Sequence, residues 1–344
     1  MTSSGKYIAL FGFYKYGNFG DDLMAVLFGL ELKSLGIPFR VYHLRPEVLA
    51  EFGFQGENCL ETLLADAAAV AYGGGGVFLS SRHDDFDTTL KNLCSTCSQR
   101  RIPIYIFSAG GDGQPSRSMS IARQELLRTA AYITFRNAED AVLLDEIGRD
   151  KGAIFDDVVW QTPAVFRRSN RPDAKTTIGI DNALLGSRRR RWPIRFLIWT
   201  CRLLRRPYRF VIIMQSITEP CHEGTVESLQ YANGLSRFID DISHMDLVIT
   251  RRLHLGMVAM SYDIPVLQFL PQPKSRLLFH RLGLNELLFS SLLSLPRLFW
   301  TVVFARDFQR LRPSQNIADF PAIIRNSEGH FREMAKAIRT ALGR

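Results

Sequence analysis

The sequence is poor in cysteine and lacks both a long apolar run and a nucleotide-binding fingerprint. Five cysteines among 344 residues are an odd number, which argues against the disulfide framework of a small secreted domain. Cys94 and Cys97 form a lone CxxC pair, and because a zinc site normally needs four ligands, we expect reduced thiols and no metal. The apolar run at residues 7–13 is too short for a signal peptide or a membrane span, so we expect a cytoplasmic protein.

A second apolar segment, residues 287–305, is interrupted at its centre by Pro296 and Arg297. A charge at the middle of a spanning helix costs about 2.5–3.5 kcal/mol on insertion scales. We therefore expect a buried or interfacial helix here rather than a membrane span.

Acidic residues are absent from one strongly basic segment. The chain has 43 Lys and Arg residues against 34 Asp and Glu residues, a net charge of +9. Residues 188–209 contain nine arginines and no acidic residue, so the rest of the chain is neutral overall. Apolar residues interleave with these arginines, as in helices that lie on anionic membranes. The alternative is an insertion, residues 186–209, whose apolar side chains pack on the second half of the protein. The candidate membrane contacts are Arg189, Arg190, Trp192 and Trp199.

Strand and helix patterns alternate along the first half of the chain. Strand-like runs lie at residues 7–13, 39–43, 69–72, 104–108 and 132–135. Helix-like segments lie between them, at residues 22–35, 85–99, 121–130 and 138–147. This alternation predicts an α/β lobe, residues 1–166, with a parallel sheet and helices on both faces.

The alternation resumes after a polar, Pro-containing linker at residues 167–175. Strands are predicted at residues 176–180, 210–214, 247–250 and 266–270, and helices at 226–243, 255–261 and 328–342. We therefore expect residues 176–344 to form a second Rossmann-like lobe. Two such lobes would enclose a cleft between their strand ends, where ligands of open α/β sheets bind.

Glycine-rich segments follow two of the predicted strands. In residues 12–22, Gly17, Asn18 and Gly20 can adopt φ > 0 and let a ligand approach the backbone. Asp21 is either a helix cap or a group that orients a hydroxyl or acts as a base. The spacing matches neither GxGxxG nor a Walker loop. The glycines at residues 73–76 suggest a backbone open to a ligand, or a tight turn.

Basic residues follow two other strands. Arg136 ends the strand at 132–135, where its guanidinium suits a phosphate or carboxylate, or a surface salt bridge. The strand at 247–250 is followed by Arg252 and His254, which lie two apart and are expected to face the same side. An anion-binding arginine beside an acid/base imidazole suits chemistry on a phosphorylated substrate, and Lys274 adds a further positive group.

Taken in order, these landmarks resemble the polysaccharide pyruvyl transferase family. They are residues 17–21, the glycines at 73–76, Arg136, Arg252 and His254, Pro265 and Lys274. Asp156 resembles the aspartate that ends the first lobe in this family. The resemblance implies a GT-B-like fold of two Rossmann-like lobes. Two departures concern the acceptor side: Asp263 and Ile264 precede Pro265, where the family has a small residue and glycine, and the Arg-rich segment interrupts the second lobe.

Members of this family transfer the enolpyruvyl unit of phosphoenolpyruvate onto sugar hydroxyls, generally as a cyclic pyruvate ketal. The resemblance implies no cofactor beyond phosphoenolpyruvate as co-substrate. It implies an acceptor sugar in exopolysaccharide or other cell-surface glycan synthesis, with a lipid-linked oligosaccharide among the candidates. It also makes His254 the general acid and places Asp21 near the reacting groups. The phosphoenolpyruvate-binding residues would be Arg136, Arg252, Lys274, Gly17, Asn18, Gly74 and Gly75.

Two other functions compete with pyruvyl transfer. A nucleotide-sugar glycosyltransferase of the same architecture would also use arginines and glycines, but residues 266–282 show no glutamate placed to hold a ribose. A membrane-associated scaffold without catalysis would not need Arg136, Arg252 and His254. Nucleic-acid binding fits the charge, but no helix-turn-helix, zinc-finger or RNP-like signature accompanies it.

Overall fold

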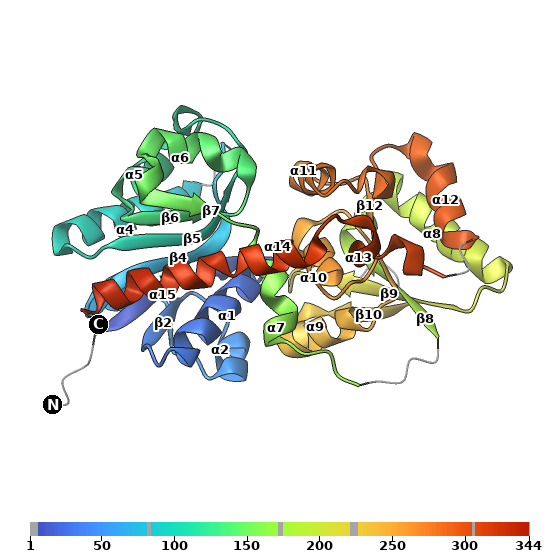
Figure 1. The fold of residues 1–344 in the computed structure, drawn as a ribbon. Helices are drawn as coiled ribbons and strands as arrows, with labels where there is room; N and C mark the ends of the chain where they lie inside the picture. The colour runs from blue at the N-terminus through green and yellow to red at the C-terminus, as the bar shows by residue number, and fades with distance from the viewer. Residues whose placement is uncertain (1–5, 81–83, 171–174, 221–225, 305–306, 344) are drawn as a thin grey trace. The chain divides into compact units, whose positions relative to one another are not determined.

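The computed structural model describes residues 6–80, 84–170, 175–220, 226–304 and 307–343, and it divides into two compact units (Figure 1). Unit 1 comprises Met1–Gly17, Asp21–Gln161 and Ile324–Arg344, and unit 2 comprises Asn18–Gly20 and Thr162–Ile323. Part of the predicted linker, residues 171–174, lies outside the described residues, as does Arg189 beyond its backbone.

Unit 1 is built on a parallel seven-stranded sheet in the order β3-β2-β1-β4-β5-β6-β7. Its central strands form because they are apolar runs that the flanking helices bury; all five residues of β1 are buried. The strands are β1 Tyr7–Phe11, β2 Phe39–Tyr42, β3 Gly56–Glu57, β4 Ala67–Phe78, β5 Ile104–Gly111, β6 Tyr132–Phe135 and β7 Gly152–Ile154. The helices are α1 Phe19–Ser34, α2 Pro46–Phe52, α3 Leu60–Leu64, α4 Asp84–Arg100, α5 Ile121–Thr129, α6 Ala141–Ile147 and α15 Gly329–Ala341.

The last helix of the chain belongs to unit 1 rather than to the second lobe, which was predicted to run to residue 344. Helix α15 buries His330, Met334 and Ile338, a spacing of four that places them on one face. That helix contacts β4, β5 and β6. The first unit therefore breaks off at Gln161 and is completed by residues 324–344, after the chain has passed through unit 2.

Unit 2 contains a parallel six-stranded sheet in the order β10-β9-β8-β11-β12-β13. The strands are β8 Thr176–Asp181, β9 Tyr208–Met214, β10 Glu227–Gln230, β11 Leu247–Thr250, β12 Val266–Phe269 and β13 Leu288–Phe289. The helices are α7 Thr162–Val165, α8 Arg188–Leu203, α9 Leu235–Ser243, α10 Leu253–Ser261, α11 Pro273–Arg281, α12 Leu295–Val303, α13 Pro313–Asn316 and α14 Phe320–Ser327, the last of which continues into unit 1.

Two predictions in unit 2 are wrong. The helix predicted over residues 226–243 is a strand in its first part, because β10 adds to the sheet edge beside β9, and the helix begins only after Gly234. The Arg-rich segment is not an insertion. Parallel strands need a crossover connection, and α8 is the crossover between β8 and β9. Its apolar residues do pack on this unit: Ile194, Leu197, Ile198 and Cys201 are buried.

The second apolar segment does not form one long helix. It forms the short strand β13 and then α12, which buries Leu298, Val302 and Val303; Ala305, the predicted end of the segment, lies outside the described residues. Among the described residues, no helix combines the length and the apolar character needed to cross a membrane.

Candidate functional site

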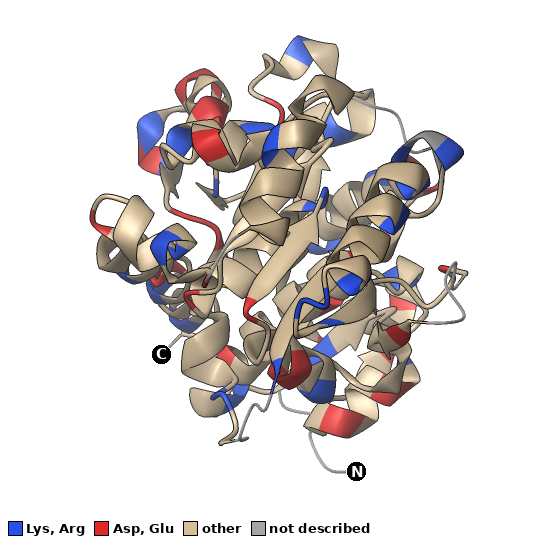
Figure 2. Ribbon diagram, turned by 90° about the vertical axis from the view of Figure 1, so that its right-hand side faces the viewer, with Lys and Arg blue, Asp and Glu red and all other residues tan. Residues whose placement is uncertain are grey.

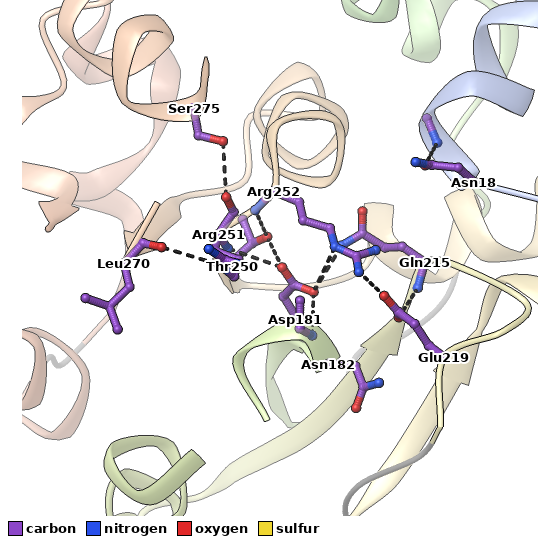
Figure 3. A network of polar contacts seen from close by, with 12 residues as sticks. Asn18, Asp181, Asn182, Gln215, Glu219, Thr250, Arg251, Arg252, Leu270 and Ser275 are labelled. Carbon is purple, nitrogen blue, oxygen red and sulfur yellow. Dashed lines mark hydrogen bonds and ion pairs between the residues drawn. The ribbon is translucent and has the colours of Figure 1, made fainter. Parts of the chain in front are cut away.

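The carboxylate of Asp181 is the centre of a polar network at the carboxyl ends of the unit 2 strands (Figure 3). Asp181 ends β8 and is fully buried. One of its oxygens accepts hydrogen bonds from the Thr250 hydroxyl at 2.8 Å and the Arg251 backbone N–H at 3.2 Å. The other accepts from the Gln215 side-chain amide at 3.2 Å and the Ala183 backbone N–H at 3.0 Å. The ends of β8, β9 and β11 are thereby fixed relative to one another.

Basic side chains gather around this carboxylate. Arg252 forms a close ion pair with Glu219, and its Nε lies 4.0 Å from an Asp181 oxygen. Burial, followed by repulsion from Arg190, lowers the pKa of Arg251; Arg252 adds to the repulsion and Asp181 opposes it. Cations held this close repel one another, so the cluster favours an anion that would offset the repulsion.

Two helices begin beside the same cluster. Arg252 is the N-cap residue of α10 and Gln272 that of α11, and neither side chain caps its helix. The backbone carbonyl of Arg251 accepts hydrogen bonds from the Gln272 N–H at 3.1 Å and the Ser275 hydroxyl at 3.2 Å, which ties the start of α11 to the end of β11. Lys274 lies between these two residues in the first turn of α11. Helix N-termini attract anions through their N–H groups, so the backbone adds to the positive potential of Arg251, Arg252 and Lys274.

His254 lies in the first turn of α10, against the segment Asn18–Gly20, which also belongs to unit 2. A Cβ atom at position 20 would collide with the imidazole, so only glycine fits beside His254. Arg252 reaches Glu219, and His254 lies against Gly20. Both partners adjoin Gln215, whose backbone N–H donates to Glu219 at 3.1 Å and whose carbonyl accepts from the Phe19 N–H at 3.0 Å.

The segment Asn18–Gly20 is anchored to unit 2 by backbone and aromatic contacts. The Phe19 N–H donates to the Gln215 carbonyl at 3.0 Å, and the Phe19 ring contacts those of Tyr231 and Phe238 with centroids 5.8 and 4.8 Å apart. Asn18 is the residue before α1, and its side-chain oxygen accepts from the Gly20 N–H at 3.0 Å. Gly17 has φ +57°, in the left-handed region. The predicted binding residues Gly17 and Asn18 thus form the turn that starts α1.

Asp21 and the glycines of residues 73–76 come together in unit 1. The glycines lie within β4, not in a loop after it, and Gly74 and Gly75 have φ of +76° and +96°. A Cβ atom at Gly74 would collide with Met24, and one at Gly75 would lie 3.8 Å from an Asp21 oxygen. These glycines allow α1 to pack closely over the strand, and they place Gly75 beside the Asp21 carboxylate.

Arg136 is buried in unit 1 beside a carboxylate. It follows β6, is 2% exposed, and places its Nη1 2.8 Å from an Asp157 oxygen. Gly110 leaves room for the guanidinium, because a Cβ there would lie 2.5 Å from the Arg136 Nε. Asp156, the residue that resembles the family aspartate, instead accepts from the Asn326 side chain at 2.8 Å. The neighbouring Asp157 is therefore the partner of Arg136.

The two thiols of the CxxC pair are packing residues. Cys94 and Cys97 are buried on α4, and burial raises the pKa of Cys94 to about 11 and that of Cys97 to about 12. Thiols with such pKa values are protonated at neutral pH and react poorly.

A family model for polysaccharide pyruvyl transferases matches residues 18–270, well over half of the chain. The chain belongs to the polysaccharide pyruvyl transferase family. The matched region includes Gly20, Asp181, the Arg251–Arg252 pair and His254, and the family is one of transferases. A search of curated proteins finds no match.

Solved structures with the same fold are distant in sequence. MnaA of S. aureus, in a structure with UDP, has a TM-score of 0.63 at 14% identity, covering 98% of this chain and 97% of that one. UDP-GlcNAc 2-epimerase from Neisseria meningitidis, bound to UDP-GlcNAc, has a TM-score of 0.65 at 14% identity over 96% and 100%. The wall teichoic acid polymerase TagF, as an H444N variant, has a TM-score of 0.58 at 8% identity over 98% and 89%. These similarities confirm the predicted α/β, GT-B-like fold.

Several residues that hold the predicted basic side chains in place were not predicted. In unit 2, Asp181, Gln215 and Glu219 make the contacts that hold the basic residues. In unit 1, Asp157 pairs with Arg136. None of these four residues was selected from the sequence. The available signal was position: Asp181 ends an apolar strand and Gln215 directly follows one. The roles of Arg136, Arg252, His254, Lys274 and Asp21 in substrate binding and catalysis stay predictions.

Proposed function

We propose that this protein transfers the enolpyruvyl unit of phosphoenolpyruvate to hydroxyl groups of a sugar, forming a pyruvate ketal in exopolysaccharide or other cell-surface glycan synthesis. The observation that supports this proposal is the basic cluster of Arg251, Arg252 and Lys274 at two helix N-termini, with His254 on the first turn of α10. Phosphoenolpyruvate carries a phosphate and a carboxylate, and such a cluster suits both groups.

Each group of the cluster has a place in the reaction. Arg252 and Lys274 bind the anionic groups of phosphoenolpyruvate, and the N-termini of α10 and α11 add backbone donors. The Asp181 carboxylate accepts hydrogen bonds from the Thr250 hydroxyl and the Arg251 backbone N–H and so holds the cluster in position. Fixed positive groups stabilise developing phosphate charge without reorganising during the reaction.

His254 is the proposed general acid. Its proton goes to the methylene carbon of phosphoenolpyruvate, the double bond supplies the electron pair, and a cationic centre forms at the carbon that bears the phosphate. A sugar hydroxyl adds to this centre and loses its proton, and inorganic phosphate leaves with the C–O electron pair. A second hydroxyl then adds to the same carbon and loses its proton, which closes the ketal ring. Of the two protons released, one restores His254 and the other is taken up by the phosphate. Asp21 is the proposed group that orients or deprotonates the sugar hydroxyl. We place this reaction in the cytoplasm, where phosphoenolpyruvate is formed.

The direct test is phosphoenolpyruvate binding and turnover. We expect phosphoenolpyruvate to raise the melting temperature and, with a suitable glycan, to yield inorganic phosphate and a product heavier by one pyruvate less water. Lys274→Met should weaken phosphoenolpyruvate binding, whereas Arg276→Met, an exposed cation on the same helix, should not. Equal effects of the two variants would contradict the proposed anion site.

A nucleotide-sugar reaction is the second candidate, since MnaA and the Neisseria epimerase were solved with UDP and UDP-GlcNAc. The same cluster would suit a nucleoside diphosphate. Stabilisation by UDP and not by phosphoenolpyruvate would favour this candidate over pyruvyl transfer.

A further inference from the structure

An apolar surface with basic surroundings covers helices α8 and α12 of unit 2. Its members are large apolar side chains that are 40–69% exposed: Trp192, Phe196, Trp199, Leu203, Leu204, Trp300 and Phe304. We call this set the aromatic face. Isolated exposed apolar residues are ordinary on protein surfaces, but a contiguous group of this size marks an interaction site.

Ring contacts and a hydrogen bond join the two helices that carry the aromatic face. On α8, the ring of Phe196 stacks on Trp192 and Trp199, with centroids 5.5 and 5.7 Å apart. Phe196 also contacts Phe299 of α12 at 5.2 Å, and the Arg206 Nε donates to the Val303 carbonyl at 2.6 Å. The two helices are therefore fastened to each other, and their outward rings are held in place by contacts within the face.

The sequence around the aromatic face contains no acidic residue. Residues 182–218 contain nine arginines without one Asp or Glu, and residues 287–306 are likewise free of acidic residues. Arg188, Arg195 and Arg202 are exposed along α8, and Arg205 is exposed just after it. Basic residues recur on this side of the molecule in Figure 2. The partner of this face must therefore be both anionic and apolar.

We propose that the aromatic face docks unit 2 onto the surface of an anionic lipid bilayer. Tryptophan rings insert at the level of the head groups, and arginines beside them bind lipid phosphates. A second copy of this chain fits poorly, because a twofold interface would oppose arginines with arginines. Nucleic acid fits less well, because Leu203 and Leu204 offer no stacking surface to bases and the rings already stack on one another.

The N-terminal end of α8, the helix that carries part of the aromatic face, lies close to the basic cluster. Helix α8 begins soon after the Asn182–Leu184 turn that follows Asp181, and Arg190 of its first turn is near enough to Arg251 to lower the pKa of that residue. If the proposed function holds, docking brings the unit 2 site to the bilayer surface, where it meets a lipid-linked sugar acceptor. This last step rests on the proposed function; the docking itself does not.

Vesicle binding tests the docking without any enzyme assay. We expect the full chain to sediment with phosphatidylglycerol-containing vesicles, to sediment less at high salt, and not to sediment with phosphatidylcholine vesicles alone. Replacing Trp192, Trp199 and Trp300 together with alanine should reduce the bound fraction at least about tenfold, and so should replacing Arg188, Arg195, Arg202 and Arg205 with glutamine. The matched charge control replaces four exposed arginines of unit 1 with glutamine: Arg100, Arg128, Arg332 and Arg339.

Tryptophan fluorescence gives a second readout on the unmodified protein. Trp192, Trp199 and Trp300 are exposed, so vesicles should shift their emission to the blue and brominated lipid should quench it. Buried Trp160 in unit 1 should not be quenched. Vesicle binding that survives both sets of substitutions, or no vesicle binding at all, would overturn the proposal. So would a dimer, or a nucleic-acid complex, that those substitutions abolish while vesicle binding persists. Failure of phosphoenolpyruvate binding with intact vesicle binding would reject the proposed function alone.

Discussion

Replacing Arg136 with methionine should destabilise unit 1 strongly. Arg136 and Asp157 form an ion pair of 2.8 Å whose side chains are only 2% and 5% exposed. Removing the cation leaves a buried carboxylate without its counter-charge, which costs about 3–5 kcal/mol in comparable sites. With a urea dependence of about 2 kcal/mol per molar, the unfolding midpoint should fall by about 1.5–2.5 M.

The fluorescence of Trp160 can report this loss separately from unit 2. Trp160 is buried close to Asp157 in the chain, whereas the other three tryptophans lie exposed in unit 2. The blue emission component in a urea titration therefore follows unit 1. Arg149→Met is the control, because Arg149 pairs with Asp145 at the surface and such a pair contributes about 0–1 kcal/mol.

A double variant tests the reasoning further. Arg136→Met combined with Asp157→Leu removes both charges. The double variant should therefore lose less free energy of unfolding than the two single variants together, by at least about 1 kcal/mol. An unchanged midpoint in Arg136→Met would refute a structural ion pair. If the double variant regains stability but phosphoenolpyruvate no longer stabilises it, Arg136 also binds substrate.

Three further predictions concern histidine and glycine positions. His254→Ala should leave the fold intact and reduce pyruvyl transfer at least about 100-fold, the scale of a positioned acid; near-normal turnover in a folded variant would reject that role. Gly20→Ala should reduce turnover by displacing His254, with circular dichroism showing retained secondary structure. Burial lowers the pKa of His330 to about 3, so between this value and about pH 6.5 the unfolded chain binds a proton that the folded chain does not. The contribution of His330 to the free energy of unfolding is therefore fully present above about pH 6.5. It falls by about 1.4 kcal/mol per pH unit as the pH drops from there toward the folded pKa. His330→Leu should flatten that slope in acid titrations of stability, and His280→Gln, at an exposed histidine, should not.

The fold was largely predictable from the sequence where strands are continuous apolar runs. The strands at residues 132–135 and 247–250 were predicted with the bounds that the structure has. Short edge strands such as β10 and β13 were missed, because pairing with a neighbouring strand, rather than their own residues, makes them strands. The packing of α15 on unit 1 was also missed, because an amphipathic pattern predicts a helix but does not say which sheet covers its apolar face.

The cations of the candidate site could be selected from the sequence, whereas the groups that hold these cations could not. Arginine and histidine at the carboxyl end of a parallel strand indicate a ligand site by their position alone, because ligands of open α/β sheets bind at that end. Asp181 and Asp157 were missed because their importance depends on partners that lie far away in the sequence, as Thr250 does for Asp181. The glycines at residues 73–76 were correctly selected as places of close approach, but the approaching group includes helix α1. Sequence alone does not distinguish a ligand from a neighbouring helix.

The interleaved course of the chain has a consequence for its synthesis. Unit 1 needs residues 324–344, and unit 2 needs Asn18–Gly20, so neither unit is a continuous stretch of chain. Most proteins made on the ribosome can complete their N-terminal domain while later residues are still being added. Here the strands β4, β5 and β6 contact α15, whose residues are translated only after all of unit 2. A premature stop that removes only α15 would therefore leave the first-made part of the protein unfinished.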